Sequence, residues 1–120
     1  MQITQAELEV MKVLWRAPGL AASDVASALE SEQDWTIKTV KTLLARLVEK
    51  GALKTEPDGR RFLYHPEIKE AEYRKRAAGQ FVDRVFDGRA APLVAHLADA
   101  RGLSPADIEE LESLLERLKS

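Results

Sequence analysis

Residues Trp35–Leu53, WTIKTVKTLLARLVEKGAL, form the stretch that decides the fold. Its apolar residues recur every three or four positions: Ile37, Val40, Leu44 and Leu47. This spacing is typical of a helix with one buried face. Thr36 is a residue type that caps helix N-termini, and Gly51 is a type that ends helices in the left-handed conformation. The sequence therefore predicts a helix over residues 36–50.

The opposite face of this predicted helix is basic and rich in hydroxyl groups: Lys38, Thr39, Lys41, Thr42 and Arg46. No acidic residue follows Trp35 before Glu49. A helix that only faces solvent on an acidic protein would normally have both signs of charge. A merely solvated face is the alternative, but the pattern favours an anionic partner, and we interpret the stretch as a DNA recognition helix.

The charge distribution supports this interpretation, although the net charge of the 120-residue chain is −2. Residues 1–34 have a balance of −4, residues 35–65 of +4 and residues 66–120 of −2. Phosphate binding requires a local basic surface, whatever the total charge is. Residues 35–65 provide such a surface.

Two helices and a hairpin are expected around the central helix. Thr4 and Glu7 fit a capping box at the start of a helix that runs to about Arg16. A second short helix is predicted over residues 23–30. After Gly51, the sequence predicts a strand over 53–56, a turn at Pro57-Asp58-Gly59 and a second strand over 60–65. Three helices followed by a hairpin wing predict a mainly α fold, a winged helix-turn-helix domain over residues 1–66.

The rest of the chain, residues 67–120, is predicted to be helical, with segments over 68–85, 92–100 and from Ser104-Pro105 onward. Three short helices of this kind cannot enclose a good core alone, so we expect them to be buried against a second copy. The residues assigned to this dimerisation surface are Phe81, Val85, Leu93, Leu97, Ile108, Leu111, Leu115 and Leu118.

The candidate DNA-binding residues are Trp35, Thr36, Lys38, Thr39, Lys41, Thr42, Arg46, Lys50, Arg60 and Arg61. Early positions of a recognition helix reach base edges, where lysines donate to guanine and threonine methyls pack on thymine. Arg46 and Lys50 are expected at phosphates, and the wing arginines at the backbone or the minor groove. Trp35 is assigned to the helix cap or to a sugar–phosphate strand, with a core position as the alternative.

Other classes of site are not indicated. The absence of cysteine excludes disulfides, thiolate metal sites and a cysteine nucleophile. His65 and His96 have no second ligand at metal spacing, and no phosphate loop, nucleophile elbow or His-Glu-x-x-His motif occurs. We therefore expect no enzyme, metal, cofactor or small-molecule ligand. With no long apolar run and no signal peptide, the expected location is the cytoplasm.

Several motifs together resemble the penicillinase repressor family of transcriptional regulators: EVMKVLW (9–15), DWTIKTVKTLLARLVEKGAL (34–53), GRRFLYHP (59–66), FVDRVFDG (81–88) and IEELESLLERL (108–118). The resemblance implies a bacterial repressor with an N-terminal winged helix and a helical region that forms a homodimer on inverted-repeat operators. It also implies groove contacts by residues 35–42. A further implied partner is a membrane sensor-protease, triggered by β-lactam, that leads to a cut in the dimerisation region.

The chain departs from the family pattern at three places. The matching cleavage region is His96–Leu97, which replaces the Asn-Phe pair of the resistance repressors. The cysteine cluster of the copper-responsive branch is missing. Ala21 stands where the family often has a capping Thr, so Ser23 is expected to cap the second helix from a later start. Two other hypotheses are a winged helix that binds an acidic protein partner and a non-specific DNA-binding protein.

Overall fold

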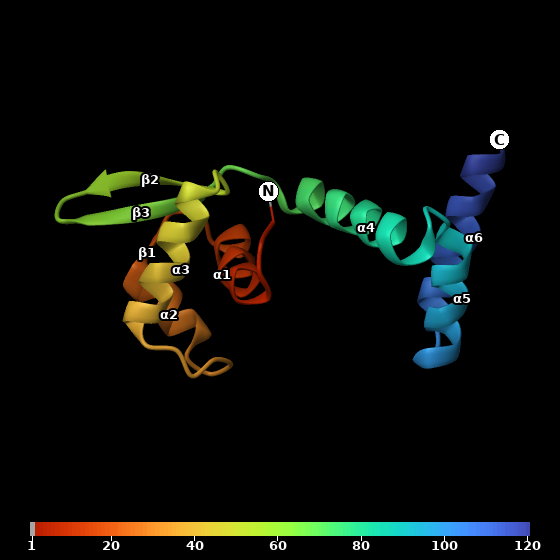
Figure 1. The fold of residues 1–120 in the computed structure, drawn as a ribbon, viewed down its shortest axis with the longest axis horizontal. Coiled ribbons are helices and arrows are strands. Elements are labelled where there is room, and N and C mark those ends of the chain that lie inside the picture. Colours follow the sequence, from red (N-terminus) through yellow and green to blue (C-terminus); the bar gives the residue numbers. More distant parts are fainter. Residues whose placement is uncertain (1) are drawn as a thin grey trace. The chain divides into compact units, whose positions relative to one another are not determined.

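The computed structural model describes residues 2–120, which form two compact units, one ending at Tyr73 and the other running from Arg74 to Ser120. The elements, shown in Figure 1, are α1 (Gln5–Arg16), β1 (Leu20–Ala21), α2 (Ala22–Leu29), α3 (Ile37–Glu49), β2 (Leu53–Asp58), β3 (Arg61–Pro66), α4 (Glu70–Phe86), α5 (Ala90–Ala100) and α6 (Pro105–Lys119). Three helices and a small antiparallel sheet in the first unit confirm the predicted winged helix.

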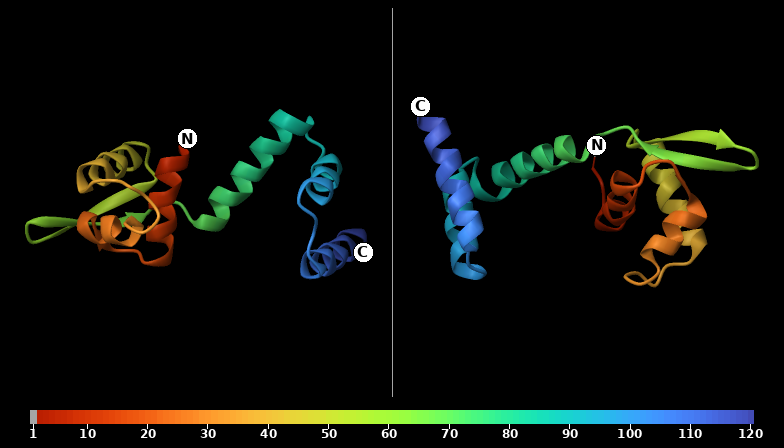
Figure 2. Two further views of the ribbon diagram at one scale, coloured as in Figure 1. Left: turned by 90° about the horizontal axis from the view of Figure 1, so that it is seen from below. Right: turned by 180° about the vertical axis from the view of Figure 1, so that it is seen from behind.

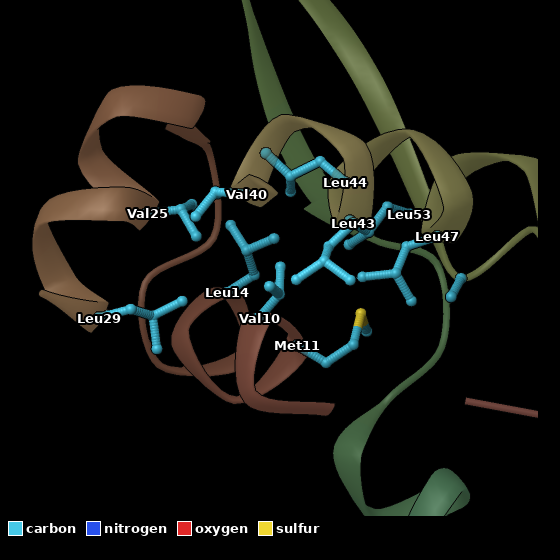
Figure 3. Packing of buried hydrophobic residues seen from close by; sticks show 11 residues of the cluster. Val10, Met11, Leu14, Val25, Leu29, Val40, Leu43, Leu44, Leu47 and Leu53 are labelled. Atoms are coloured by element: carbon cyan, nitrogen blue, oxygen red, sulfur yellow. The ribbon is translucent and has the colours of Figure 1, made fainter. Parts of the chain in front are cut away.

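The core of the first unit lies between α1, α2, α3 and the start of β2 (Figure 3). Its buried residues are Val10, Met11, Leu14, Val25, Leu29, Val40, Leu43, Leu44, Leu47, Ala52 and Leu53. The expectation that Ile37 faces inward is wrong, because its side chain is 46% exposed. Helical side chains point toward the N-terminus, so a residue in the first turn projects past the end of the helix. Leu43, between Val40 and Leu47 in the sequence, completes the buried stripe instead.

The helix caps fix the ends of α1 and α3. Thr4 and Glu7 form the predicted capping box, with both backbone-to-side-chain hydrogen bonds present. The Thr36 hydroxyl accepts a hydrogen bond from the backbone N–H of Thr39, as predicted for the start of α3. At the other end Gly51 has φ +81°, and the amide of Ala52 donates to the Leu47 carbonyl at 2.9 Å. The sequence therefore predicted both limits of α3 correctly.

The start of α2 differs from the prediction. The helix begins at Ala22, and no side chain occupies the N-cap position at Ala21. Instead, the Asp24 carboxylate accepts a hydrogen bond from the Ala21 backbone N–H at 3.2 Å. The expectation that Ser23 caps a later start is wrong, because Ser23 already lies in the first turn of α2 and the Asp24 carboxylate binds the backbone of the N-cap residue. Ala21 also lies in β1, a strand of two residues that is too short to give a sequence pattern.

The sheet has the strand order β1-β3-β2, with both pairs antiparallel. Asp58 pairs with Arg61, so the turn consists of Gly59 and Arg60 and lies later than the predicted Pro57-Asp58-Gly59. Gly59 has φ +66°, which a tight hairpin loop requires. Pro57 is inside β2, opposite Phe62, and an edge strand tolerates a residue without an N–H. The hairpin projects beyond the three helices of its unit (Figure 2).

The first unit extends past Pro66, where the sequence places the domain boundary. The indole Nε1 of Trp15 donates to the Ile68 carbonyl at 2.9 Å, and its ring lies 5.7 Å from the ring of Tyr73. Trp15 is therefore a structural residue of α1 that fixes the segment leading into α4.

The second unit has little interior of its own. None of the residues of α4, α5 and α6 is buried. Phe86 packs between the rings of Phe81 and His96, at centroid distances of 5.9 and 5.7 Å. The large apolar side chains that remain exposed are Phe81, Val85, Leu97, Ile108, Leu114, Leu115 and Leu118. Within residues 2–120, no helix has the length and apolar character needed to cross a membrane.

Candidate nucleic-acid interface

The exposed face of α3 gathers the side chains that the sequence predicts to contact DNA. Lys38, Thr39, Lys41, Thr42 and Arg46 are all exposed, whereas the core residues of the same helix are fully or nearly fully buried. Residues three or four apart share a helical face, so Lys38 and Thr42 point directly outward. Lys41 lies on one flank of this face, and Thr39 and Arg46 lie on the other. The face is broad enough to present a central row and two edges.

The threonine hydroxyls of this face are partly committed to the helix itself. Thr42 Oγ1 donates to the Lys38 carbonyl at 3.1 Å, and Thr36 Oγ1 lies 3.3 Å from Thr39 Oγ1. Because Thr42 uses its only donor, its hydroxyl is left as an acceptor. The hydrogen-bond donors toward a ligand are therefore mainly the cations of this face, Lys38, Lys41 and Arg46.

Most cations of this surface have no ion-pair partner among the described residues. Across residues 2–120, no carboxylate lies within ion-pair distance of Lys38, Lys41, Arg46 or Arg60. By contrast, Lys12 and Lys54 each have a glutamate partner, at 3.6 and 3.4 Å. Arg61 is intermediate: its Nε bonds to Asp58 at 3.1 Å, which leaves the rest of the guanidinium group open. An anion binding here would meet uncompensated positive charge.

Lys50 is placed differently from the prediction that it meets a phosphate. Its ammonium donates to the Gln2 carbonyl at 2.8 Å and to the carboxylate of Glu7, which is 1% exposed. Burial alone would raise the pKa of Glu7, but the hydrogen bonds from Lys50 and Thr4 and the charge of Lys50 outweigh it and lower that pKa. Lys50 therefore joins the end of α3 to the start of α1. No sequence pattern predicts this pair.

Trp35 is half-buried and packs against the core of the first unit. Of the three positions that the sequence left open for Trp35, the helix cap, a sugar–phosphate strand and the core, the structure favours the core. The neighbouring Thr36 is exposed and caps α3, so both residues hold the entry to the helix.

A groove of about 250 Å³ separates α3 from the wing. Its walls include Ile37 and Lys41 on the helix side and Arg60, Arg61, Phe62 and Tyr64 on the hairpin side. Ile37 and Phe62 are 46% and 50% exposed, so two large apolar side chains line a basic groove. Neither residue was predicted to belong to the interface: Ile37 was assigned to the buried face of α3, and Phe62 was overlooked although it stands beside two arginines in a predicted strand.

The two histidines lie apart from this groove's lining. His65 Nε2 lies 3.2 Å from Glu56 Oε1 on the neighbouring strand, and His96 stacks on Phe86 in the second unit. Over the part of the chain that the structure describes, no three His, Asp or Glu side chains are grouped to hold a metal ion.

Comparisons with known proteins point to one family. A family model described as penicillinase repressor matches residues 3–117. The chain is 37% identical over 119 residues to the penicillinase repressor of Bacillus licheniformis, covering 99% of this chain and 93% of that protein. It is 29% identical over 116 residues to the methicillin resistance regulatory protein MecI of Staphylococcus aureus (strain N315), covering 97% and 94%.

A solved structure resembles the first unit. The solution structure of the monomeric form of Bacillus licheniformis BlaI in complex with the blaP half-operator superposes with a TM-score of 0.53 at 44% identity. The match covers 61% of this chain and 89% of that chain.

Proposed function

The chain belongs to the penicillinase repressor family, and we propose that it represses transcription as a homodimer bound to inverted-repeat operator DNA. The general role of DNA-binding transcriptional repressor follows from the family and its relatives. We also propose that it acts in the bacterial cytoplasm, where its operator would be. The domain division in this proposal is a DNA-binding domain over residues 1–66 and a dimerisation domain over 67–120.

The observation that supports DNA as the partner is the set of exposed cations on α3 and the wing that have no ion-pair partner among the described residues. A protein that neutralises phosphates with lysine and arginine releases the counterions condensed on the duplex, which favours binding. Lys38, Lys41, Arg46 and Arg60 are exposed and free for this purpose within the described residues. The relative of known structure with 44% identity in this region was solved on a half-operator.

The roles of the individual residues follow from their positions on α3. We propose that Lys38 and Thr42, which point directly outward, reach base edges in the major groove, with Thr39 beside them and Lys41 on the flank that faces the wing. Arg46 and the wing arginines would meet the sugar–phosphate backbone. Lys50 is left out of this set because its ammonium already binds Glu7 and the Gln2 carbonyl.

The apolar surface of the second unit supports a second copy of the chain as the partner. Its helices bury none of their residues, yet expose leucines, a valine and phenylalanine along α4, α5 and α6. Exposed apolar area of this extent is stabilised by association, and most soluble oligomers are symmetric homodimers. The proposed contact residues are those that the sequence assigns: Phe81, Val85, Leu93, Leu97, Ile108, Leu111, Leu115 and Leu118.

Release of the repressor by proteolysis in this region is the remaining part of the proposal. His96 and Leu97, the residues that match the family's cleavage site, are exposed but lie inside α5. A helical peptide bond must first open locally before a protease can act on it. We therefore propose that any cut there requires α5 to unfold in part. A sensor-protease or another signal would lead to the cut.

The test is a salt titration of the full chain on duplex DNA from its own upstream promoter, against a scrambled duplex of equal length. Binding to the promoter that survives moderate salt, while the scrambled duplex is lost, is the expected result. Equal, salt-labile binding to both duplexes would leave only a non-specific electrostatic surface, and no binding at all would favour an acidic protein partner. A Lys41→Ala variant should weaken promoter binding. Lys12→Ala is the matched control and should not weaken it, because the ammonium of Lys12 pairs with Glu9 in the wild type.

A further inference from the structure

The groove between α3 and the wing combines two kinds of chemistry. Positive charge comes from Lys41 on one wall and from Arg60 and Arg61 on the other. Apolar surface comes from Ile37 in the first turn of α3 and from Phe62 on β3. A ligand that fits both must be anionic at one point and apolar next to it.

Neither apolar side chain is explained by the core of its own unit. Ile37 and Phe62 are about half exposed, and neither belongs to the buried cluster or to the residues packed against it. Both lie in the first unit, apart from the apolar surface of α4–α6 that the dimer proposal uses. Exposed large apolar groups on a strongly basic surface favour a partner that covers them.

The position of the groove relative to α3 indicates which part of DNA would enter it. Lys38 and Thr42 point outward from the centre of the exposed face, toward the base edges in the proposed complex. Ile37 and Lys41, four residues apart, lie together on the flank that faces the wing. When a helix enters the major groove and a wing reaches the neighbouring minor groove, one backbone strand must pass between them.

We propose that this groove holds one sugar–phosphate segment of each operator half-site. The phosphate binds Lys41 and the wing arginines, and the C–H surface of the adjacent deoxyribose packs between Ile37 and Phe62. Deoxyribose fits this wall because it has no 2′-hydroxyl, which would lose its water against two apolar side chains without gaining a partner. The proposal rests on the proposed function, since it names the part of the operator that one groove receives.

Charge and apolar contacts can be separated by their salt dependence. Replacing Lys41 with Met should reduce the slope of log affinity against log salt by about one, as expected for the loss of one phosphate contact. Ile37→Ala and Phe62→Ala should each weaken binding by about fivefold without changing that slope, because half of a large apolar side chain loses its cover. Phe62→Leu, which keeps an apolar group, should bind nearly as well as the wild type.

Neutral backbone substitutions can locate the phosphate. Each phosphate of the half-site is replaced in turn by a neutral methylphosphonate, and the affinity is measured. At one position the replacement should weaken binding of the wild type but should not weaken binding of Lys41→Met any further. Arg46→Met, a cation on the opposite flank of α3, should remain sensitive at that position. A single ribonucleotide at the adjoining sugar should weaken the wild type, and Phe62→Ala should reduce this sensitivity.

The outcomes distinguish this inference from the proposed function. If the wild type does not prefer promoter over scrambled duplex, the proposed function fails. If it does, but Ile37→Ala and Phe62→Ala bind like the wild type, only the sugar–phosphate groove is overturned. Replacing a thymine of the half-site by uracil removes a methyl group from a base and leaves the sugar unchanged. If Phe62→Ala abolishes the effect of this replacement but not the effect of the ribonucleotide, the groove holds a base and the sugar–phosphate proposal is again overturned. Both side chains lie outside the core, so unchanged circular dichroism and thermal midpoints are expected for the variants.

Discussion

The Glu7–Lys50 pair offers the sharpest test of how α3 is held against α1. Glu7 is 1% exposed, and one of its oxygens accepts hydrogen bonds from Lys50 and from the Thr4 backbone. Its second oxygen, Oε2, is buried without a hydrogen-bond partner in the described structure. Glu7→Gln would keep the first acceptor, remove the charge and place an amide group where no acceptor is available.

We expect Glu7→Gln to lower the free energy of unfolding by about 2 kcal/mol at pH 7, the usual size of a charge-assisted hydrogen bond with a buried group. The cost is smaller than for a fully buried ion pair because the Lys50 side chain is 31% exposed and water can solvate its ammonium. For a unit of this size the thermal midpoint should fall by about 10 °C. Glu9→Gln is the matched control, since Glu9 pairs with Lys12 at 3.6 Å on the surface; it should change the stability by less than about 0.5 kcal/mol.

The pH dependence has a definite sign. The pKa of Glu7 is lower in the folded state than in the unfolded chain, so its stabilisation is fully present above the unfolded value. That value is about 4.3 for a free glutamate, and the contribution is lost as the pH falls through the lower folded pKa. The stability difference between wild type and Glu7→Gln should therefore be constant from neutral pH down to about 5 and shrink below it.

Urea unfolding of the full chain, followed by the fluorescence of its two tryptophans between pH 3 and 7, measures both effects. In Lys50→Met, burial of Glu7 is no longer offset by the ammonium, so the pKa should rise and stability should decrease as the pH increases. Equal stabilities of Glu7→Gln and wild type, or parallel pH profiles for all three proteins, would refute the reasoning.

Three further outcomes are expected. Gly51→Ala should destabilise the first unit by about 1 kcal/mol in urea unfolding, because φ is +81° there although a Cβ would meet no atom within 4 Å; Gly79→Ala, inside α4 with φ outside the left-handed region, is the control and should not destabilise. Thr36→Ala should cost about 1 kcal/mol through the lost cap of α3, and Thr36→Ser should recover most of it in the same assay. Leu115→Asp, on the exposed face of α6, should convert the proposed dimer to monomers in analytical ultracentrifugation, whereas Glu112→Gln should leave the dimer unchanged; a dimeric Leu115→Asp would contradict the assigned interface.

The parts of the fold that the sequence predicted depend on local interactions. The limits of α3 follow from Thr36 and Gly51, and the capping box of α1 follows from Thr4 and Glu7. Each of these residues acts on the helical turn next to it. The winged-helix order followed from a change of period, from 3.6 in the helices to strand and turn residues after Gly51.

Apart from the start of α2, the errors involve contacts between segments that are distant in sequence. A period of 3.6 places Ile37 on the buried face of its helix but does not show where the neighbouring helices end. The exposure of the Ile37 side chain could therefore not be predicted from the sequence. The sequence does not distinguish Lys50 from any other basic residue at the end of a helix. Its partner, the buried carboxylate of Glu7, lies on α1 and is close to it only in the folded chain. The turn at Pro57 was misplaced because proline is common in turns, and only the strand order identifies β2 as an edge that tolerates it.

The position of Pro57 also affects how the protein behaves at high concentration. An edge strand normally presents a row of N–H and C=O groups to which another chain can add, a route to aggregation. In β2, Pro57 removes one donor, and Lys54, Glu56 and Asp58 place charges along the same short strand. The wing can therefore extend from its helices into solvent without acting as a template for further strands. Association of two copies of the chain edge to edge through β2 is disfavoured, and contacts through other surfaces are not affected.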